Sequence, residues 1–313
     1  MTDSKTPTSP LVRSLRTDLR YQWASLHLLH SLAALTAVAA VFAVGAWLSA
    51  RSAVTALAEE FAYLRREGGY TFDRAIGGGD PADAPLRATW EFASATVANL
   101  HPVQGAVSLL QVLTFVVGPL VFFTYGVIAA TRDRRHGTLR LRTVREGPRR
   151  LFASMAGALA VTVTAVGVAA CAVTLVISTA LSLAADGGID TSALAVPEDL
   201  SVTAPLPVLA ALIGSGLFFA LLGMSVALVV GRPLIVIPAF LAAFFLVPVL
   251  GPFDPRNLLM VLAHPHMEFV GGFAPSPPLA VSPPLAAALL ALGTAAAAAL
   301  AHTVHSRRSA HTG

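Results

Sequence analysis

Long uninterrupted stretches of apolar residues dominate the chain, and shorter polar or charged segments separate them. A transmembrane helix needs about 20 predominantly apolar residues to cross roughly 30 Å of hydrocarbon. Six stretches meet this requirement without any Asp, Glu, Lys or Arg: residues 31–50, 106–130, 151–185, 206–230, 233–250 and 284–304. The pattern predicts an all-α integral membrane protein, with a bundle of six transmembrane helices over residues 31–304.

The segment before the first span, residues 1–30, has the periodicity of an amphipathic helix. Five apolar residues recur at helical spacing and three arginines occupy another side: Leu11, Leu15, Leu19, Trp23 and Leu26, with Arg13, Arg16 and Arg20. Such a helix lies in the membrane interface with its apolar side toward lipid. We expect an interfacial helix here; the alternative is a cytosolic helix packed on another surface.

The longest polar segment, residues 51–105, has two helical patterns around a Gly/Pro/Asp-rich stretch at residues 77–85. The first is the apolar stripe Val54, Leu57, Phe61 and Leu64, and the second passes through Trp90 and Phe92. We expect a small helical extracytoplasmic domain in this loop. Two further outer loops are predicted at residues 186–204 and 251–282.

Composition supports the membrane assignment. Of the 313 residues, 55% are hydrophobic and only 12% are charged, whereas a soluble domain carries about a quarter charged residues. The mean hydropathy is +0.71. The single cysteine, Cys171, excludes an intrachain disulfide and a cysteine metal site.

The net charge of the chain is +4, and the excess of positive over negative side chains alternates from one loop to the next. The N-terminus, residues 131–150, the turn at residues 231–233 and the tail at residues 305–313 together carry 15 positive and 4 negative side chains; the other loops carry 6 and 13. Lysine and arginine accumulate in cytoplasmic loops. The charge therefore predicts both termini in the cytoplasm, and it indicates a topology signal rather than nucleic-acid binding. High Ala, Arg and Gly with one lysine indicate a GC-rich bacterial genome, and we expect a multi-pass protein of the bacterial inner membrane.

Residues 131–150, between the second and third spans, predict a short helix at the cytoplasmic surface. Gly137 suits the end of the incoming helix, since glycine adopts the left-handed conformation readily. Thr138 is a candidate N-cap for a helix at residues 139–145, and Gly147-Pro148 ends it.

The side chains of this short helix fall on two neighbouring faces. Leu141 and Val144 are three residues apart and share one face, while Arg142 and Arg145 share the next. A short basic helix held between two long spans suits contact with an acidic groove on another protein.

The same segment resembles the permease subunits of ABC-2 type exporters. The matching residues are Arg132, Asp133, Gly137, Thr138, Leu139, Leu141, Pro148 and Arg150. Six spans, a surface helix before the first and a long outer loop after it are also similar to that family. The sequence departs from the family pattern in having Asp133 as the only acid before Gly-Thr, and Arg140 and Arg142 at positions that are commonly apolar.

The resemblance implies that this segment is a coupling helix that docks on a separate ABC ATPase subunit. The residues expected to couple are Gly137, Thr138, Leu139, Leu141, Arg142, Val144, Arg145 and Pro148. It also implies a second permease subunit, in a homodimer or heterodimer, and a re-entrant or capping segment at residues 253–278. The chain has no Gly-x-x-x-x-Gly-Lys-Ser/Thr motif. ATP and magnesium are therefore expected on the partner ATPase, with no cofactor and no catalytic residue on this chain.

Three other functions are weighed against this one. The sequence contains no recognisable motif of an intramembrane enzyme. The best candidate metal cluster is His264 and His266 with Asp254 and Glu268, and no metal is expected there. A proton-coupled carrier needs ionisable groups inside the membrane, and the predicted spans contain no Asp, Glu, Lys or Arg. A stand-alone membrane protein, such as an assembly factor or a sensor, remains the main alternative.

Polar residues within the spans are expected to pack helices or to bond backbone carbonyls rather than to contact substrate. They are Gln111, Thr114, Thr124, Tyr125, Thr162, Thr164, Ser215 and Ser225.

Overall fold

The computed structural model describes residues 9–24, 26–68, 76, 84–135, 138–189, 194, 201–267 and 277–311. Every regular element in those residues is a helix, which confirms the all-α prediction. The elements are α1 (Pro10–Ala24), α2 (His27–Gly68), α4 (Ala84–Ala98), α5 (Pro102–Val112), a π-helix (Leu113–Val117), α6 (Gly118–Arg135), α7 (Leu139–Glu146), α8 (Pro148–Asp186), α9 (Pro205–Val230), α10 (Pro233–Leu246), α11 (Pro255–Ala263), a 3₁₀ turn (His264–His266) and α12 (Pro283–His311).

Five helical stretches in the described residues are long and apolar enough to cross a membrane: His27–Arg66, Pro102–Arg132, Arg149–Asp186, Pro205–Val230 and Pro283–Val304. The fifth predicted span, residues 233–250, is not among them. Its helix, α10, has only 14 residues, which corresponds to about 21 Å and falls short of the hydrocarbon thickness. The predicted count of six spans is therefore not confirmed: the described residues contain five candidate spans, and α10 is a shorter apolar helix.

The early end of α10 has a specific cause. Val247 precedes Pro248 and is extended, with φ −88° and ψ 121°, because the proline ring disfavours helical geometry in the residue before it. The Arg256 guanidinium then donates to the carbonyl oxygens of Phe244, Val247 and Pro248 at 2.9–3.0 Å. These carbonyls are left unsatisfied where a helix ends, so Arg256 closes the end of α10.

Asp254 holds that arginine in place. Its carboxylate lies 2.8 Å from Nη2 of Arg256 and accepts the Arg256 backbone N–H at 2.9 Å, which makes it the N-cap of α11. Burial raises the pKa of Asp254, but the hydrogen bonds from Arg256 and from the Leu250 amide, with the charge of Arg256, outweigh it. The pKa therefore lies below the ordinary value of 3.8.

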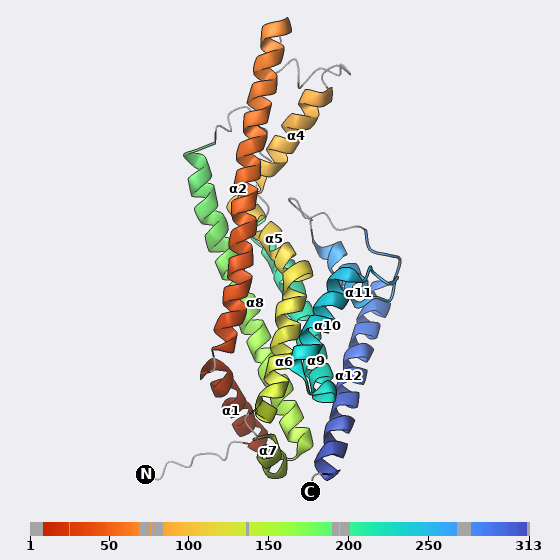
Figure 1. Ribbon diagram of the computed structural model, residues 1–313. Helices are drawn as coiled ribbons and strands as arrows, with labels where there is room; N and C mark the ends of the chain where they lie inside the picture. Colours follow the sequence, from red (N-terminus) through yellow and green to blue (C-terminus); the bar gives the residue numbers. More distant parts are fainter. Residues whose placement is uncertain are drawn as a thin grey trace, which may run out of the picture.

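The helix that contains the first predicted span, residues 31–50, continues well beyond residue 50. Helix α2 continues for 42 residues to Gly68, a length of about 63 Å. No Gly or Pro interrupts residues 46–67, so nothing stops the helix once it begins. Its second half packs against α4 through Leu57, Leu86 and Ala93, all of them buried, and the two helices extend beyond the rest of the bundle (Figure 1).

The centre of the bundle is the contact between α6 and α9. A Cβ at Gly126 would overlap the carbonyl oxygen of Ala220, and a Cβ at Gly223 would overlap that of Phe123. Glycine at both positions lets the two backbones touch, as small residues do between helices in lipid. Phe122, which is fully buried, fills the core beside this contact.

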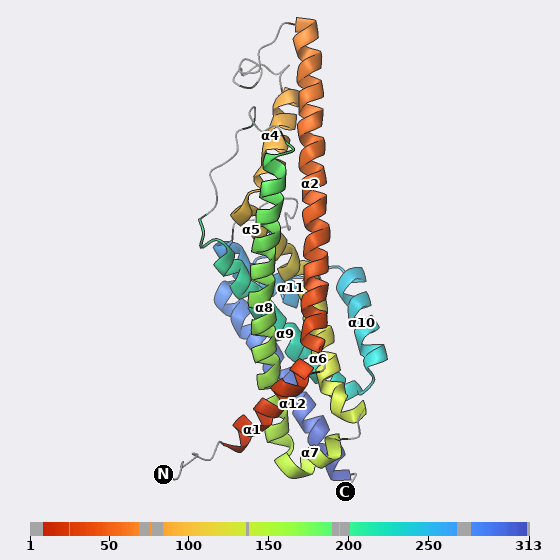
Figure 2. The ribbon, with the colours of Figure 1, turned by 90° about the vertical axis from the view of Figure 1, so that its left-hand side faces the viewer.

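The two ends of the bundle differ. Helices α1 and α7 and the C-terminal part of α12 lie together at one end, and the long extension of α2 with α4 lies at the other (Figures 1 and 2). The segments that carry the excess of arginine are thus gathered at one end of the molecule.

Candidate functional site

Helix α7 forms a short bridge between α6 and α8. The predicted helix at residues 139–145 is confirmed as Leu139–Glu146. Gly147 follows with φ 76°, a left-handed region that favours glycine. Pro148 then begins α8, where the missing proline N–H costs nothing. The predicted stop at Gly147-Pro148 is correct.

Thr138 does not act as the predicted cap. It precedes α7 with helical angles, φ −86° and ψ −12°, and its side chain makes no capping hydrogen bond, because a capping residue needs extended angles to aim its oxygen at the first turn. Gly137 lies outside the described residues, as do the side chains of Leu139 and Pro148.

The apolar face of α7 is not covered by any other part of the described chain. Leu141 is 72% exposed and Val144 is 83% exposed. Arg145 is also exposed. Helix α7 therefore presents two branched apolar side chains with an arginine beside them.

Helix α1 packs against the bundle through a polar stripe. Ser14, Asp18 and Gln22 are spaced four residues apart and are all buried. Ser14 donates to Glu146 on α7 at 2.6 Å, and Gln22 accepts from Thr162 on α8 at 2.5 Å. The predicted helix is found as α1, but a stripe of polar residues on it contacts protein, while the predicted arginine side is exposed. Leu11 and Trp23 are exposed on α1, and Leu26 lies beyond its end and is also exposed.

Asp18 is the centre of this contact. Its carboxylate is 2% exposed and lies 3.2 Å from Arg132 at the end of α6 and 2.9 Å from Arg142 on α7. Ser154 on α8 donates to it at 2.8 Å. One side chain of α1 therefore joins three helices. The only signal of this stripe in the sequence is the four-residue spacing of polar residues at positions 14, 18 and 22. The prediction from the apolar residues of the same helix did not use it.

Arg142 consequently differs from the other predicted coupling residues. It pairs with Asp18 and lies 3.5 Å from Glu146 one turn later on α7. Its guanidinium lies in the junction with α1, whereas Arg145 is exposed at the edge of that junction. The geometry makes Arg142 an anchor that fixes α7 to α1, and leaves Leu141 and Val144 exposed for external contact.

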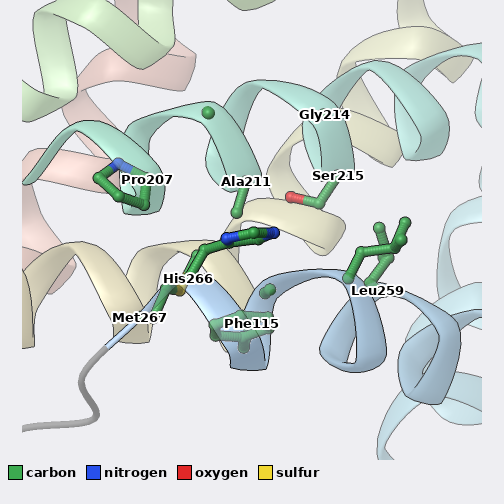
Figure 3. Close-up of a pocket in the computed structure, with 11 residues that line it drawn as sticks. Phe115, Pro207, Ala211, Gly214, Ser215, Leu259, His266 and Met267 are labelled. Atoms are coloured by element: carbon green, nitrogen blue, oxygen red, sulfur yellow. The ribbon is translucent and has the colours of Figure 1, made fainter. Parts of the chain in front are cut away.

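A second feature is a pocket of about 390 Å³ between α9, α11 and the π-helix. Figure 3 shows the ring of His266 in it, directed toward α9 beside Ala211, with Phe115 on the opposite wall. A π-helix inserted in an α-helix is often found at functional sites. The lining is almost entirely apolar, and Ser215 bonds the carbonyl of Leu212 rather than the pocket.

The candidate metal cluster does not assemble in the described part of the chain. Asp254 is engaged by Arg256, Glu268 lies outside the described residues, and no group of three or more His, Cys, Asp or Glu among the described residues is placed to hold an ion.

Several polar residues of the spans bond nearby carbonyls of their own helices, as expected. Thr114 bonds Leu110, Thr164 bonds Ala160 and Ser215 bonds Leu212. Thr162 is an exception because it also reaches α1 through Gln22. These hydroxyls therefore serve helix packing and the attachment of α1.

Comparison of the chain with protein-family models, curated protein sequences and solved structures returned no match. The functional assignment thus rests on the geometry above and on the motif of residues 131–150.

Proposed function

We propose that the chain is the membrane-spanning subunit of an ATP-driven ABC-2 type exporter in the bacterial inner membrane. The observation that carries the proposal is the arrangement of α7, which exposes Leu141 and Val144 while Arg142 binds it to α1. An apolar surface that is rigidly fixed and has no partner in the described chain is what a docking helix requires. The ATPase, with its ATP and magnesium, is a separate subunit, and a second permease subunit completes the assembly.

The proposed topology places α1, α7 and the end of α12 in the cytoplasm. The excess of arginine at that end of the molecule supports this orientation. The short helix α10, continued by apolar residues 247–250, serves as a sixth and incomplete pass, so that both termini lie on the same side. The extension of α2 with α4 is then the extracytoplasmic domain.

The mechanism follows from the contacts of α7. A push by the ATPase on Leu141 and Val144 reaches α8 directly through Gly147-Pro148, and it reaches α1 through the Arg142–Asp18 pair. The spans would then rearrange to release substrate outward. The chain contributes the path and the coupling element, and the partner contributes hydrolysis.

The test is affinity purification of the tagged chain from its native membrane in mild detergent, with mass spectrometry of retained proteins. Recovery of a P-loop ATPase at near-equal stoichiometry supports the proposal. Val144→Asp should reduce that recovery about tenfold or more, as expected for a central interface residue. Val202→Asp is a matched control, because Val202 is 85% exposed and lies just before α9, away from α7.

A chain that purifies alone, even after crosslinking in the membrane, would contradict the exporter assignment. The result would favour a stand-alone membrane protein, such as a sensor or an assembly factor. An equal loss of ATPase recovery in both variants would show that α7 is not the docking element.

A further inference from the structure

The junction of α1 with α7 and α8 contains a cleft of about 190 Å³. Helix α1 contributes one wall and the end of α7 with the start of α8 contributes the other. The lining residues are Pro10, Arg13, Ser14, Thr17, Arg145, Glu146 and Arg150. Pockets that enclose drug-sized ligands measure about 300–1,000 Å³, so the cleft fits a small group or one end of a larger molecule.

The charges around the cleft do not balance. The two buried or half-buried acids, Asp18 and Glu146, are matched by Arg132 and Arg142. Three arginines remain on the cleft itself, and in the described part of the chain none of their guanidinium groups forms an ion pair: Arg13, Arg145 and Arg150.

Both hydroxyl groups of the cleft already donate hydrogen bonds within the protein. Ser14 donates to Glu146, and Thr17 donates to the backbone carbonyl of Arg13 at 3.0 Å. The donors left for a ligand are therefore guanidinium groups, which bind phosphate oxygens in a planar, bidentate manner.

Apolar side chains flank the cleft on α1. Leu11 and Val12 are exposed next to Pro10 and Arg13, and the apolar part of α8 begins at Leu151, directly after Arg150. Basic residues followed by apolar surface are the arrangement met by a lipid, whose phosphate lies above its acyl chains.

We propose that this cleft binds a phosphoryl group, supplied by the headgroup of an anionic phospholipid. The bound phosphate bridges Arg13 on α1 to Arg145 and Arg150 at the other wall, and so adds an external link beside the internal Asp18–Arg142 pair. The site belongs to this chain alone and does not depend on the docking of an ATPase.

The test is a titration of the purified full-length chain in mild detergent, with bound lipid counted by native mass spectrometry. The probes are phosphatidylglycerol, phosphatidylcholine and inorganic phosphate. The double variant Arg13→Gln with Arg150→Gln removes two cleft arginines and leaves α7 intact. The matched control, Arg16→Gln with Arg149→Gln, removes two exposed arginines from the same two helices that do not line the cleft. Equal melting temperatures of both variants establish that they are folded.

We expect one saturable phosphatidylglycerol per chain, bound at least about tenfold more weakly by the cleft variant and within about twofold of wild type by the control. Competition by inorganic phosphate at equal concentration would show a phosphoryl site filled by free phosphate, and it would overturn the assignment to a lipid headgroup. Equal binding of phosphatidylcholine, or equal weakening in both variants, would overturn the proposal, because each result would show that the cleft arginines have no selective part.

Discussion

Asp18 and Arg142 lie 124 positions apart in the sequence, yet their side chains form a 2.9 Å ion pair whose carboxylate is almost completely buried. The pair attaches the first helix of the chain to the short helix between α6 and α8. Arg132 and Ser154 complete the environment of the carboxylate. The orientation of α7, and with it the exposure of Leu141 and Val144, depends on this contact.

Asp18→Asn is predicted to destabilise the protein by about 3 kcal/mol, since removing one partner of a buried ion pair leaves the other charges uncompensated. The melting temperature in detergent, followed by size-exclusion chromatography, measures the effect. Asp186→Asn is the control, because Asp186 is exposed at the end of α8. Similar melting temperatures for the two variants would show that the Asp18 cluster does not hold α1.

Asp18→Asn and Arg142→Gln should be less than additive when combined. Residues in one ion-pair network show coupling energies of about 0.5–3 kcal/mol. A double-mutant cycle on the melting data gives the value. Full additivity would mean that the two residues act independently, contrary to their contact.

Gly223→Ala is predicted to destabilise the contact between α6 and α9. The added Cβ would overlap the carbonyl oxygen of Phe123, and a backbone atom cannot move aside as the end of a side chain can. Overpacking of this kind costs about 1–3 kcal/mol. Gly214→Ala on the same helix is the control, since a Cβ there meets nothing within 4 Å. If both variants retain the wild-type melting temperature, the backbones of α6 and α9 do not approach each other as closely as described.

Stability at the junction of α10 and α11 is predicted to depend on acid pH through Asp254. Its pKa is lowered in the folded protein, so its contribution is fully present above the ordinary value of 3.8 and is lost as the pH falls through the lower folded pKa. The melting-temperature difference between wild type and Asp254→Asn should therefore be largest near neutral pH and vanish in acid. A difference that is constant across this range would contradict the role given to the carboxylate.

Most of the helices follow from apolar length and from Gly or Pro at their ends, which explains the agreement at α7, α8 and α9. Two helices end at residues other than the ends of their apolar runs, because hydropathy reports where lipid begins and not where a helix stops. Helix α2 passes residue 50 without a break, and α10 ends four residues before the apolar run does. The closure of α10 by Arg256, 10 residues beyond its end, is a tertiary contact that no local pattern contains.

The candidate site was predictable in part. The bounds of α7 and the shared face of Leu141 and Val144 follow from local spacing, and both are found. The inward role of Arg142 was not predictable, because it requires knowing that α1 lies beside α7. Ser14, Asp18 and Gln22 form a polar stripe that is visible in the sequence only as four-residue spacing.

The central claim, that α7 docks on an ATPase, is tested most directly by a photo-crosslinking amino acid placed at position 144 in the native membrane. The same group at position 202 reports background, because Val144 and Val202 are similarly exposed at separate places in the bundle. We predict a crosslinked product at position 144 that contains a P-loop ATPase, and none at position 202. A product of the same composition at both positions, or no protein captured at position 144, would contradict the account.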